Sequence, residues 1–141
     1  MDSAYSKVII VDDEAPICTL LARTLSLAGY QTFTSTSPKE ALKIIEENHI
    51  KIVVSDLVMP EMNGVELLRQ VKKIDGLTQF IMISGYADIT LIVDSFRLGA
   101  NNILFKPFES NDLITEEVHH AREKLEKIKQ ILHDRKALRS S

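Results

Sequence analysis

The chain has 141 residues, of which 45% are hydrophobic and 26% are charged, and this is the composition of one ordinary globular domain. No apolar run approaches the roughly 20 residues that a membrane span needs, and the first residues lack the apolar core of a signal peptide, so we expect a cytoplasmic protein that does not engage a membrane. The 17 Lys and Arg against 20 Asp and Glu give a net charge of −3, which argues against direct nucleic-acid binding by this domain.

Short apolar, β-branched runs alternate with amphipathic segments along the chain, and this pattern predicts alternating strands and helices. We expect strands at residues 7–11, 30–34, 52–54, 79–83 and 102–105. The first is apolar throughout, as in a strand covered on both faces, whereas the second is more polar and is expected at a sheet edge. Connections of this length predict a mostly parallel sheet joined by right-handed crossovers.

Two of the predicted helices carry apolar stripes that bear on packing and partners. The helix after the first strand has its expected buried stripe at Ile17, Leu20, Leu21, Leu25 and Ala28. The helix that Asp88 can cap has a stripe of Ile89, Ile92, Val93 and Phe96. Leu91 and Leu98 lie off this second stripe, so we expect them at the surface, as ordinary scatter or as part of a partner face.

One carboxylate, Asp56, stands where a buried strand meets a loop. Gly64 interrupts this loop, and Asn63 with Glu66 forms the start signal of the next helix. An Asp at a strand end is by itself often only a cap or a turn residue. Ligands also bind at the carboxyl ends of strands in open α/β sheets, so the other strand ends decide between these interpretations.

Polar and charged side chains follow four of the five predicted strands. The first strand ends in Asp12 and Asp13, the third in Asp56, the fourth in Ser84 and the fifth in Lys106. Parallel strands bring these ends to one edge, where three carboxylates repel one another unless a cation joins them. An all-oxygen ligand set with open positions suits Mg²⁺. The sequence therefore predicts a magnesium site with Ser84 and Lys106 beside it.

The chemistry that these residues predict is phosphoryl transfer. Asp56 can attack phosphorus as a carboxylate nucleophile and form an acyl phosphate. Mg²⁺, Lys106, the Ser84 hydroxyl and backbone N–H groups would offset the charge on the phosphoryl oxygens. Gly85 leaves room for the phosphoryl group to approach.

In order and spacing, the motifs resemble those of the receiver domain of two-component response regulators: Asp12-Asp13, Asp56 with Pro60 and Gly64, Ser84-Gly85, and Lys106-Pro107-Phe108. The resemblance covers residues 5–124 and implies a flavodoxin-like (βα)5 three-layer α/β sandwich with the parallel strand order 2-1-3-4-5. It implies that a sensor histidine kinase or a histidine phosphotransfer protein phosphorylates Asp56, and that the domain then switches conformation to control a downstream output. The chain is accordingly expected not to be an enzyme but a phosphoacceptor switch, with only self-directed phosphotransfer and slow autodephosphorylation.

The resemblance also assigns roles to individual residues. It implies that Mg²⁺ is held by Asp12, Asp13, Asp56 and the backbone carbonyl of Val58. Of these, Asp12 is expected to act mainly through water. The resemblance further implies that Ser84 and Lys106 contact the phosphoryl group and that the Lys106-Pro107 peptide is cis.

One position departs from the family pattern. Receiver domains usually carry Tyr or Phe three residues before the lysine, and this ring moves inward when the hydroxyl moves toward phosphate, but here the residue is Ile103. We therefore expect phosphorylation to be intact and its usual readout on that face to be altered. Tyr86 either substitutes for the missing ring or only limits water access at the rim.

The helical pattern continues past the expected domain end near residue 124. Apolar residues alternate spacings of four and three, as in a coiled coil: Ile114, Val118, Ala121, Leu125, Ile128 and Leu132. Beyond Leu125 no sheet remains to cover this stripe, so we expect residues 125–141 to form a protruding helical extension. The extension is interpreted as a coiled-coil linker to an output module absent from this chain, with a stand-alone receiver as the alternative. A homodimer is expected through this helix, through the face of the fourth helix, fifth strand and fifth helix, or through both.

The same residues can be compared with what two other classes of protein would require. A magnesium-dependent phosphohydrolase also forms an aspartyl phosphate, but such enzymes usually have a second acid two residues after the nucleophile, where this chain has Val58. A flavodoxin-like ligand binder would need a Gly-rich phosphate loop after the first strand, where this chain has acids that repel phosphate without a metal. The acids favour the phosphoacceptor switch.

Overall fold

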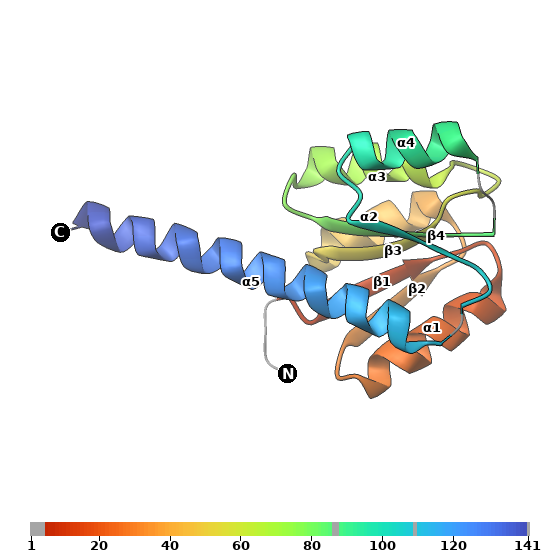
Figure 1. Ribbon diagram of the computed structural model, residues 1–141, viewed down its shortest axis with the longest axis horizontal. Helices are drawn as coiled ribbons and strands as arrows, with labels where there is room; N and C mark the ends of the chain where they lie inside the picture. Colours follow the sequence, from red (N-terminus) through yellow and green to blue (C-terminus); the bar gives the residue numbers. More distant parts are fainter. Residues whose placement is uncertain (1–4, 86–87, 109, 141) are drawn as a thin grey trace.

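Strands and helices alternate without exception in the computed structural model (Figure 1), which describes residues 5–85, 88–108 and 110–140, the last four of them as backbone only. In chain order the elements are β1 (Lys7–Val11), α1 (Ala15–Leu27), β2 (Gln31–Ser35), α2 (Pro38–Asn48), β3 (Ile52–Asp56), α3 (Gly64–Ile74), β4 (Gln79–Ser84), α4 (Ile89–Arg97), β5 (Asn102–Phe105) and α5 (Asp112–Ser140). All five predicted strands are present, with small differences at their ends.

The five strands form one parallel sheet in the order β2-β1-β3-β4-β5, which confirms the predicted topology. The chain leaves β1 for β2 on one side and returns to β3 on the other, so the switch point lies between β1 and β3. Val11 pairs in register with Ser55. The residues that follow these two, Asp12 and Asp56, are therefore placed side by side at the carboxyl edge of the sheet.

Helices cover both faces of the sheet, with α1 and α5 on one face and α2, α3 and α4 on the other (Figure 1). Alternate residues of β1 enter different cores: Ile9 and Val11 pack under α2 and α3, whereas Val8 and Ile10 pack under α1 and α5. This two-sided burial explains the continuous apolar run in β1. The more polar β2 lies at an edge, as predicted.

The loop after Asp56 is tied tightly to the start of α3. The Asn63 side chain accepts the Glu66 N–H at 2.9 Å, as its start signal predicts, and the Gly64 N–H donates to the Leu57 carbonyl at 2.8 Å. A Cβ on Gly64 would lie 2.5 Å from the carbonyl oxygen of Asp56, closer than real Cβ contacts. Gly64 therefore allows α3 to approach the strand that carries Asp56.

Two apolar stripes are oriented differently from the prediction. On α1, Leu20 is 43% exposed, although its neighbour Leu21 is fully buried. On α4 the predicted stripe is wrong: the residues packed on the core are Leu91, Ile92 and Leu98, and the exposed ones are Ile89, Val93 and Phe96. The face of α4 that packs on the core is centred on the fully buried Ser95, whose hydroxyl donates to the Leu91 carbonyl, so the apolar stripe points outward.

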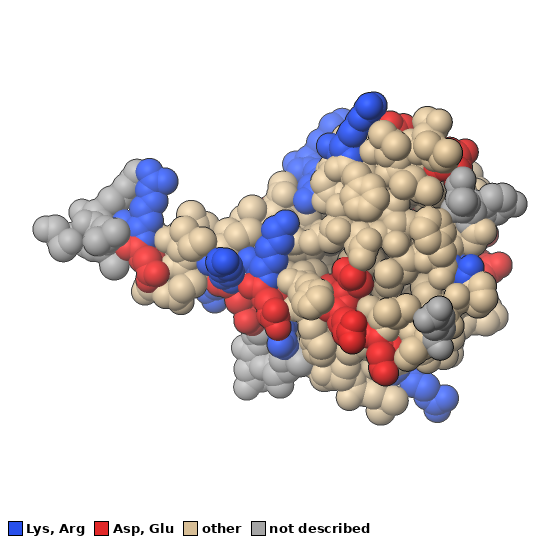
Figure 2. All heavy atoms as spheres, in the orientation of Figure 1, with Lys and Arg blue, Asp and Glu red and all other residues tan. Residues whose placement is uncertain are grey.

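α5 is one continuous helix of 29 residues, about 43 Å long at the usual rise per residue. Its first half packs on the sheet through Ile114, Val118, Ala121 and Leu125. Farther along, Ile131 and Leu132 are 56% and 54% exposed, and the helix projects away from the body (Figure 1). Figure 2 shows charged groups of both signs along this projection, with uncharged surface between them. No helix in the described part of the chain combines the length and apolar character needed to cross a membrane.

Side chains near the two opposite edges of the sheet anchor the packed half of α5. Asn102, on the edge strand β5, donates to Glu117 at 2.8 Å. On the other side, the Tyr30 hydroxyl is hydrogen-bonded to His119, and Arg122 lies over the Tyr30 ring at 5.7 Å from its centroid. These contacts fix the lateral position of α5 before it leaves the body.

We expect Gly64→Ala to lower the free energy of unfolding by about 1–3 kcal/mol, because the added methyl group would overlap the Asp56 carbonyl and the Met82 sulfur. Urea denaturation measures the change. Gly85→Ala is the matched control, since a Cβ there meets no atom within 4 Å. Equal unfolding free energies for the two variants would contradict the close-approach role of Gly64.

Leu125→Ala should cost about 2–5 kcal/mol of unfolding free energy, because Leu125 is only 2% exposed at the point where α5 leaves the sheet. Leu27→Ala, at a residue that is 84% exposed on α1, should change stability by less than about 0.5 kcal/mol. Urea denaturation compares the two variants. A negligible cost at Leu125 would show that α5 separates from the sheet earlier than the structure indicates.

Candidate functional site

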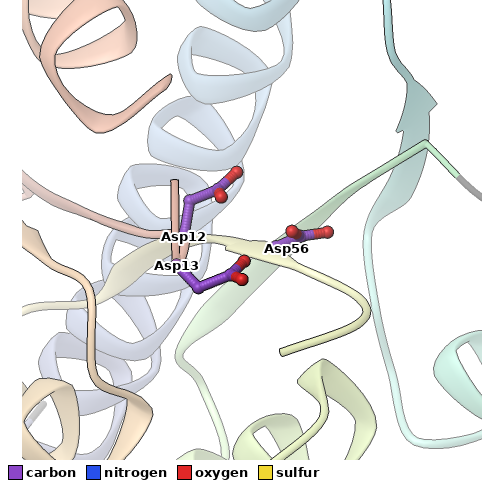
Figure 3. Close-up of side chains that lie close together, drawn as sticks. All are labelled: Asp12, Asp13 and Asp56. Carbon is purple, nitrogen blue, oxygen red and sulfur yellow. The ribbon is translucent and has the colours of Figure 1, made fainter. Parts of the chain in front are cut away.

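Three carboxylates meet at the carboxyl ends of β1 and β3. One oxygen from each of Asp12, Asp13 and Asp56 lies within 4.8 Å of the other two, and Figure 3 shows the three side chains gathered at this edge. Asp12 is fully buried and Asp56 is 7% exposed, whereas Asp13 faces solvent. The neighbouring positions of β1 and β3 at the switch point bring these distant parts of the sequence together.

The ammonium group of Lys106 lies between two of these carboxylates. Its Nζ atom is 2.8 Å from Asp12 Oδ2 and 3.4 Å from Asp56 Oδ2. The Lys106 N–H donates to the Ser84 carbonyl at 2.7 Å, and the Lys106-Pro107 peptide is cis, as the resemblance implied. Burial lowers the pKa of Lys106, but its hydrogen bond to Asp12 and the surrounding carboxylate charges outweigh this and raise the pKa above its usual value. The side chain therefore stays cationic.

The Asp56 carboxyl carries a charge that its surroundings compensate only in part. Burial and the charge of Asp12 raise its pKa, while Lys106 and the backbone N–H groups of Leu57 and Val58 oppose this rise. The Val58 N–H lies 3.5 Å from Asp56 Oδ1. Burial is the largest cause of this rise, and the pocket in addition holds three clustered carboxylates against one ammonium group.

The donor set of this pocket fits a hard divalent cation. The three clustered aspartates offer only oxygen ligands, and neither His nor Cys belongs to the cluster among the described residues. Mg²⁺ commonly takes one or two protein carboxylates and retains several waters. The exposed Asp13 opens the pocket to solvent, so the acidic cluster can hold such an ion.

Ser84 and Gly85 lie next to the carboxylates along the edge of the sheet. Asp56 pairs in register with Ile83, so the fully buried Ser84 is one residue farther along the neighbouring strand. A Cβ on Gly85 would meet no atom within 4 Å, which leaves open space beside Ser84. Tyr86, considered above as a substitute for the missing aromatic ring, lies outside the described residues.

An aromatic residue nevertheless pairs with Ser84 across neighbouring strands, at a position that the sequence did not single out. Ile103 is 8% exposed and packs in the core under α3 and α4. Phe105, two residues on, faces the same side of β5, is 47% exposed and pairs in register with Ser84. The ring on this strand is therefore at the surface, next to the lysine.

Sequence reasoning missed the part that two residues play in supporting the site. The Glu14 N–H donates to Asp12 Oδ1 at 2.9 Å, and Glu14 Oε2 is 3.8 Å from Lys106 Nζ. Glu14 directly follows two aspartates, so the acidic run was a visible signal. The close approach of Gly64 to Asp56 depends on how α3 packs on the sheet, and no local pattern signals it.

A groove of about 380 Å³ opens beside Lys106, between α1 and the segment that joins β5 to α5. Its walls are mainly apolar and include Ile17, Leu20, Pro107 and Phe108. This location explains why Leu20 is exposed although it lies on an apolar helix. The groove places an apolar surface directly next to the charged pocket.

Comparison with known proteins agrees with this geometry. The family model described as the response regulator receiver domain matches residues 8–117. Sporulation initiation phosphotransferase F of Bacillus subtilis (strain 168) is 34% identical over 107 residues, which cover 76% of this chain and 86% of that protein. Regulatory protein AtoC of Escherichia coli (strain K12) is 30% identical over 111 residues, but these are 79% of this chain and only 24% of AtoC.

Solved structures lead to the same family. The solution structure of the beryllofluoride-activated NtrC4 receiver domain dimer matches with a TM-score of 0.79 and 31% identity, covering 84% of this chain and 98% of that one. The family model spans most of the chain, and the strand order and the acidic pocket agree with it. The chain therefore belongs to the receiver domains of two-component response regulators, which are phosphoacceptor switches rather than classical enzymes.

Proposed function

We propose that Asp56 is the residue that accepts the phosphoryl group, donated by the phosphohistidine of a sensor histidine kinase or of a histidine phosphotransfer protein. The observation that carries this proposal is the position of the Asp56 carboxylate, which ends β3 in the acidic pocket with Lys106 Nζ at 3.4 Å. Asp12 has no exposed surface and Asp13 lies at the solvent side, whereas Asp56 keeps some exposed surface and lies beside the ammonium group of Lys106.

In the transfer, an oxygen of Asp56 forms a bond to phosphorus while the bond between phosphorus and the donor imidazole nitrogen breaks. The electron pair of the broken bond stays on the imidazole. Lys106 is already held near Asp56 by its ion pair with Asp12, so its charge is in place to offset the transferred oxygens. The Ser84 hydroxyl is assigned to a phosphoryl oxygen, and the open space at Gly85 gives the group room.

Mg²⁺ would be held by Asp13, Asp56 and the Val58 carbonyl directly and by Asp12 mainly through water. When bound, it supplies the positive charge that one lysine cannot provide against three carboxylates and an incoming phosphoryl group. Asp12, buried and fixed by the Glu14 N–H and by Lys106, orients the acidic cluster rather than reacting itself.

Autodephosphorylation should be slow because the residue two positions after Asp56 is the aliphatic Val58, which is 42% exposed beside the carboxylate. Val58 cannot act as a general base toward water, whereas an acidic residue at that position could. The lack of an acid at this position favours a long-lived aspartyl phosphate, as in a switch, over the rapid turnover of a phosphohydrolase.

The phosphodonor is expected to dock in the apolar groove beside Lys106. The groove is formed by α1 and the segment after β5, and it is adjacent to the pocket that contains Asp56. A donor protein that covers Leu20 and Pro107 would bring its histidine close to the carboxylate and would exclude water from it.

Residues 5–124 are expected to form the receiver unit. Residues 125–141 are expected to transmit its change of conformation to an output module. The chain spans only 24% of AtoC, so a further module in the whole protein is consistent with the comparisons. The uncovered aliphatic residues of α5 support homodimer formation through this helix, and a dimer is the form named for the NtrC4 receiver domain. The exposed Phe96 on α4 and Phe105 on β5 make the face of α4, β5 and α5 a second candidate surface.

Incubation with acetyl phosphate and Mg²⁺ should add one phosphoryl group to the protein, as seen by intact-mass measurement. We expect no adduct with Asp56→Asn or with EDTA, since the first removes the nucleophile and the second the cation. A persistent adduct on Asp56→Asn would contradict the assignment of Asp56. No adduct on the folded parent chain would indicate a receiver that works by contacts alone, and rapid continuous phosphate release would favour the phosphohydrolase.

Leu20→Asp should slow phosphotransfer from a histidine kinase at least about tenfold, because the charge would lie in the apolar docking groove. Phosphorylation by acetyl phosphate should be unchanged. The donor would be the kinase that phosphorylates the parent chain fastest in a panel of purified kinases. Leu27→Asp, on the same helix but 84% exposed and outside the groove, is the matched control. Equal kinase rates for the two variants would overturn the docking assignment.

A further inference from the structure

A small hole lies on the far side of the molecule from the acidic pocket, at the point where α5 leaves the body. Its volume is about 130 Å³, and it is lined by the largely apolar side chains of Tyr5, Leu77, Leu125, Ile128 and Leu132 together with the charged residues Lys51, Asp75 and Lys129. Ligand sites for small molecules are typically several times larger, so a hole of this size suits a single protruding side chain. Leu77, 46% exposed in the turn between α3 and β4, forms the wall opposite the helix.

Polar contacts hold the wall that carries Leu77. Lys51 Nζ lies 2.6 Å from Asp75 Oδ2, and Asp75 Oδ1 accepts the Leu77 N–H at 2.9 Å. Lys72 Nζ donates to the Thr78 carbonyl at 2.7 Å just beyond. The turn is thus bonded on both sides of Leu77, so the hole has a fixed shape.

The row of apolar coiled-coil positions on α5, here called the seam, is too short on the projecting part of the helix to hold a dimer together by itself. Leu125 is already buried against the body, so Ile128 and Leu132 are the seam positions that remain, and the next seam position is Arg135. Sustained coiled coils need about three to four heptads of apolar seam residues. A dimer through α5 therefore requires additional apolar surface from the body of each subunit.

Ile131 supplies the complementary shape. It is 56% exposed and does not line the hole of its own subunit. Successive residues of a helix are turned by about 100° around its axis. Seen down the axis of α5, the direction of Ile131 is therefore roughly 110° from the direction of the hole, and Ile128 points between these two directions. If two parallel copies of α5 pack with Ile128 at their two-fold axis, then Ile131 of each copy faces the hole of the other.

We propose that two copies of this chain dimerise by inserting Ile131 of each subunit into the hole between α5 and Leu77 of the other. This inference rests on the pairing of α5 proposed above and names the contact that makes it specific. The interface is isologous, since each subunit gives one protruding side chain and one hole. The two bodies then lie on opposite sides of the helix pair.

Cross-linking between two different variants tests this contact. Ile131→Cys is mixed with a size-tagged Leu77→Cys chain and oxidised, and a mixed disulfide is expected because the two Cβ atoms would be close across the interface. Ile131→Cys mixed with tagged Leu27→Cys is the matched control and should not cross-link. The parent chain gives the background, since its own Cys18 is buried.

Sedimentation equilibrium, with and without acetyl phosphate and Mg²⁺, gives the second readout. Leu77→Asp should raise the dimer dissociation constant about 100-fold, tenfold for each of the two holes. Leu27→Asp should leave it unchanged, and circular dichroism checks that both variants are folded.

The outcomes separate the two levels of the proposal. A parent chain that dimerises, but with neither the mixed disulfide nor an effect of Leu77→Asp, would overturn the inference and leave the pairing of α5 intact. A parent chain that stays monomeric in both phosphorylation states would overturn the pairing together with the inference. Neither result would affect the assignment of Asp56, which the mass measurement tests separately.

Discussion

One ammonium group balances a concentration of buried negative charge, and the carboxyl edge of the sheet depends on it. Lys106 Nζ contacts both Asp12, which has no exposed surface, and Asp56, which has very little. A carboxylate buried without a partner is strongly destabilising, so the pocket persists only because the lysine reaches into it from β5. Even so, three clustered carboxylates face this one ammonium group, so the formal charge of the pocket stays negative. The negative charge that Lys106 leaves uncompensated favours the binding of a cation in this pocket.

The strand order makes this arrangement possible. β1 and β3 are neighbours although a whole strand and two helices separate them in sequence, and their ends supply the three aspartates. β5 is two strands away from β3, so only a long side chain can span the distance, and the Ser84 carbonyl holds the backbone from which Lys106 extends. The aspartates, the Ser84 hydroxyl and Lys106 thus come from the ends of four strands.

Residue patterns that act over short distances could be read from the sequence, and those that depend on packing could not. The edge position of β2 and the Asn63 cap each follow from a local signal, and the convergence of the aspartates follows once the sheet is parallel, whereas the strand order came from the resemblance to receiver domains. The face of α4 was predicted wrongly because its core-facing side is centred on the polar but buried Ser95, so the core beneath selects Leu91 rather than Val93. The role of Gly64 likewise depends on an atom of another element, the Asp56 carbonyl.

The uninterrupted length of α5 has a mechanical consequence. Asn102 and Tyr30 hold its packed half from opposite sides, and its first turn begins a few residues after the lysine that senses the pocket. Beyond Leu125 the helix still lies beside Tyr5 and Leu77 around the small hole, and Lys129 Nζ lies 6.0 Å from the centroid of the Tyr5 ring. A rigid rod held near one end is a lever, so a small tilt of the packed half would displace the free end by a larger distance. With the phosphorylation of Asp56 proposed above, such a tilt would carry the signal to the far end of the helix as movement.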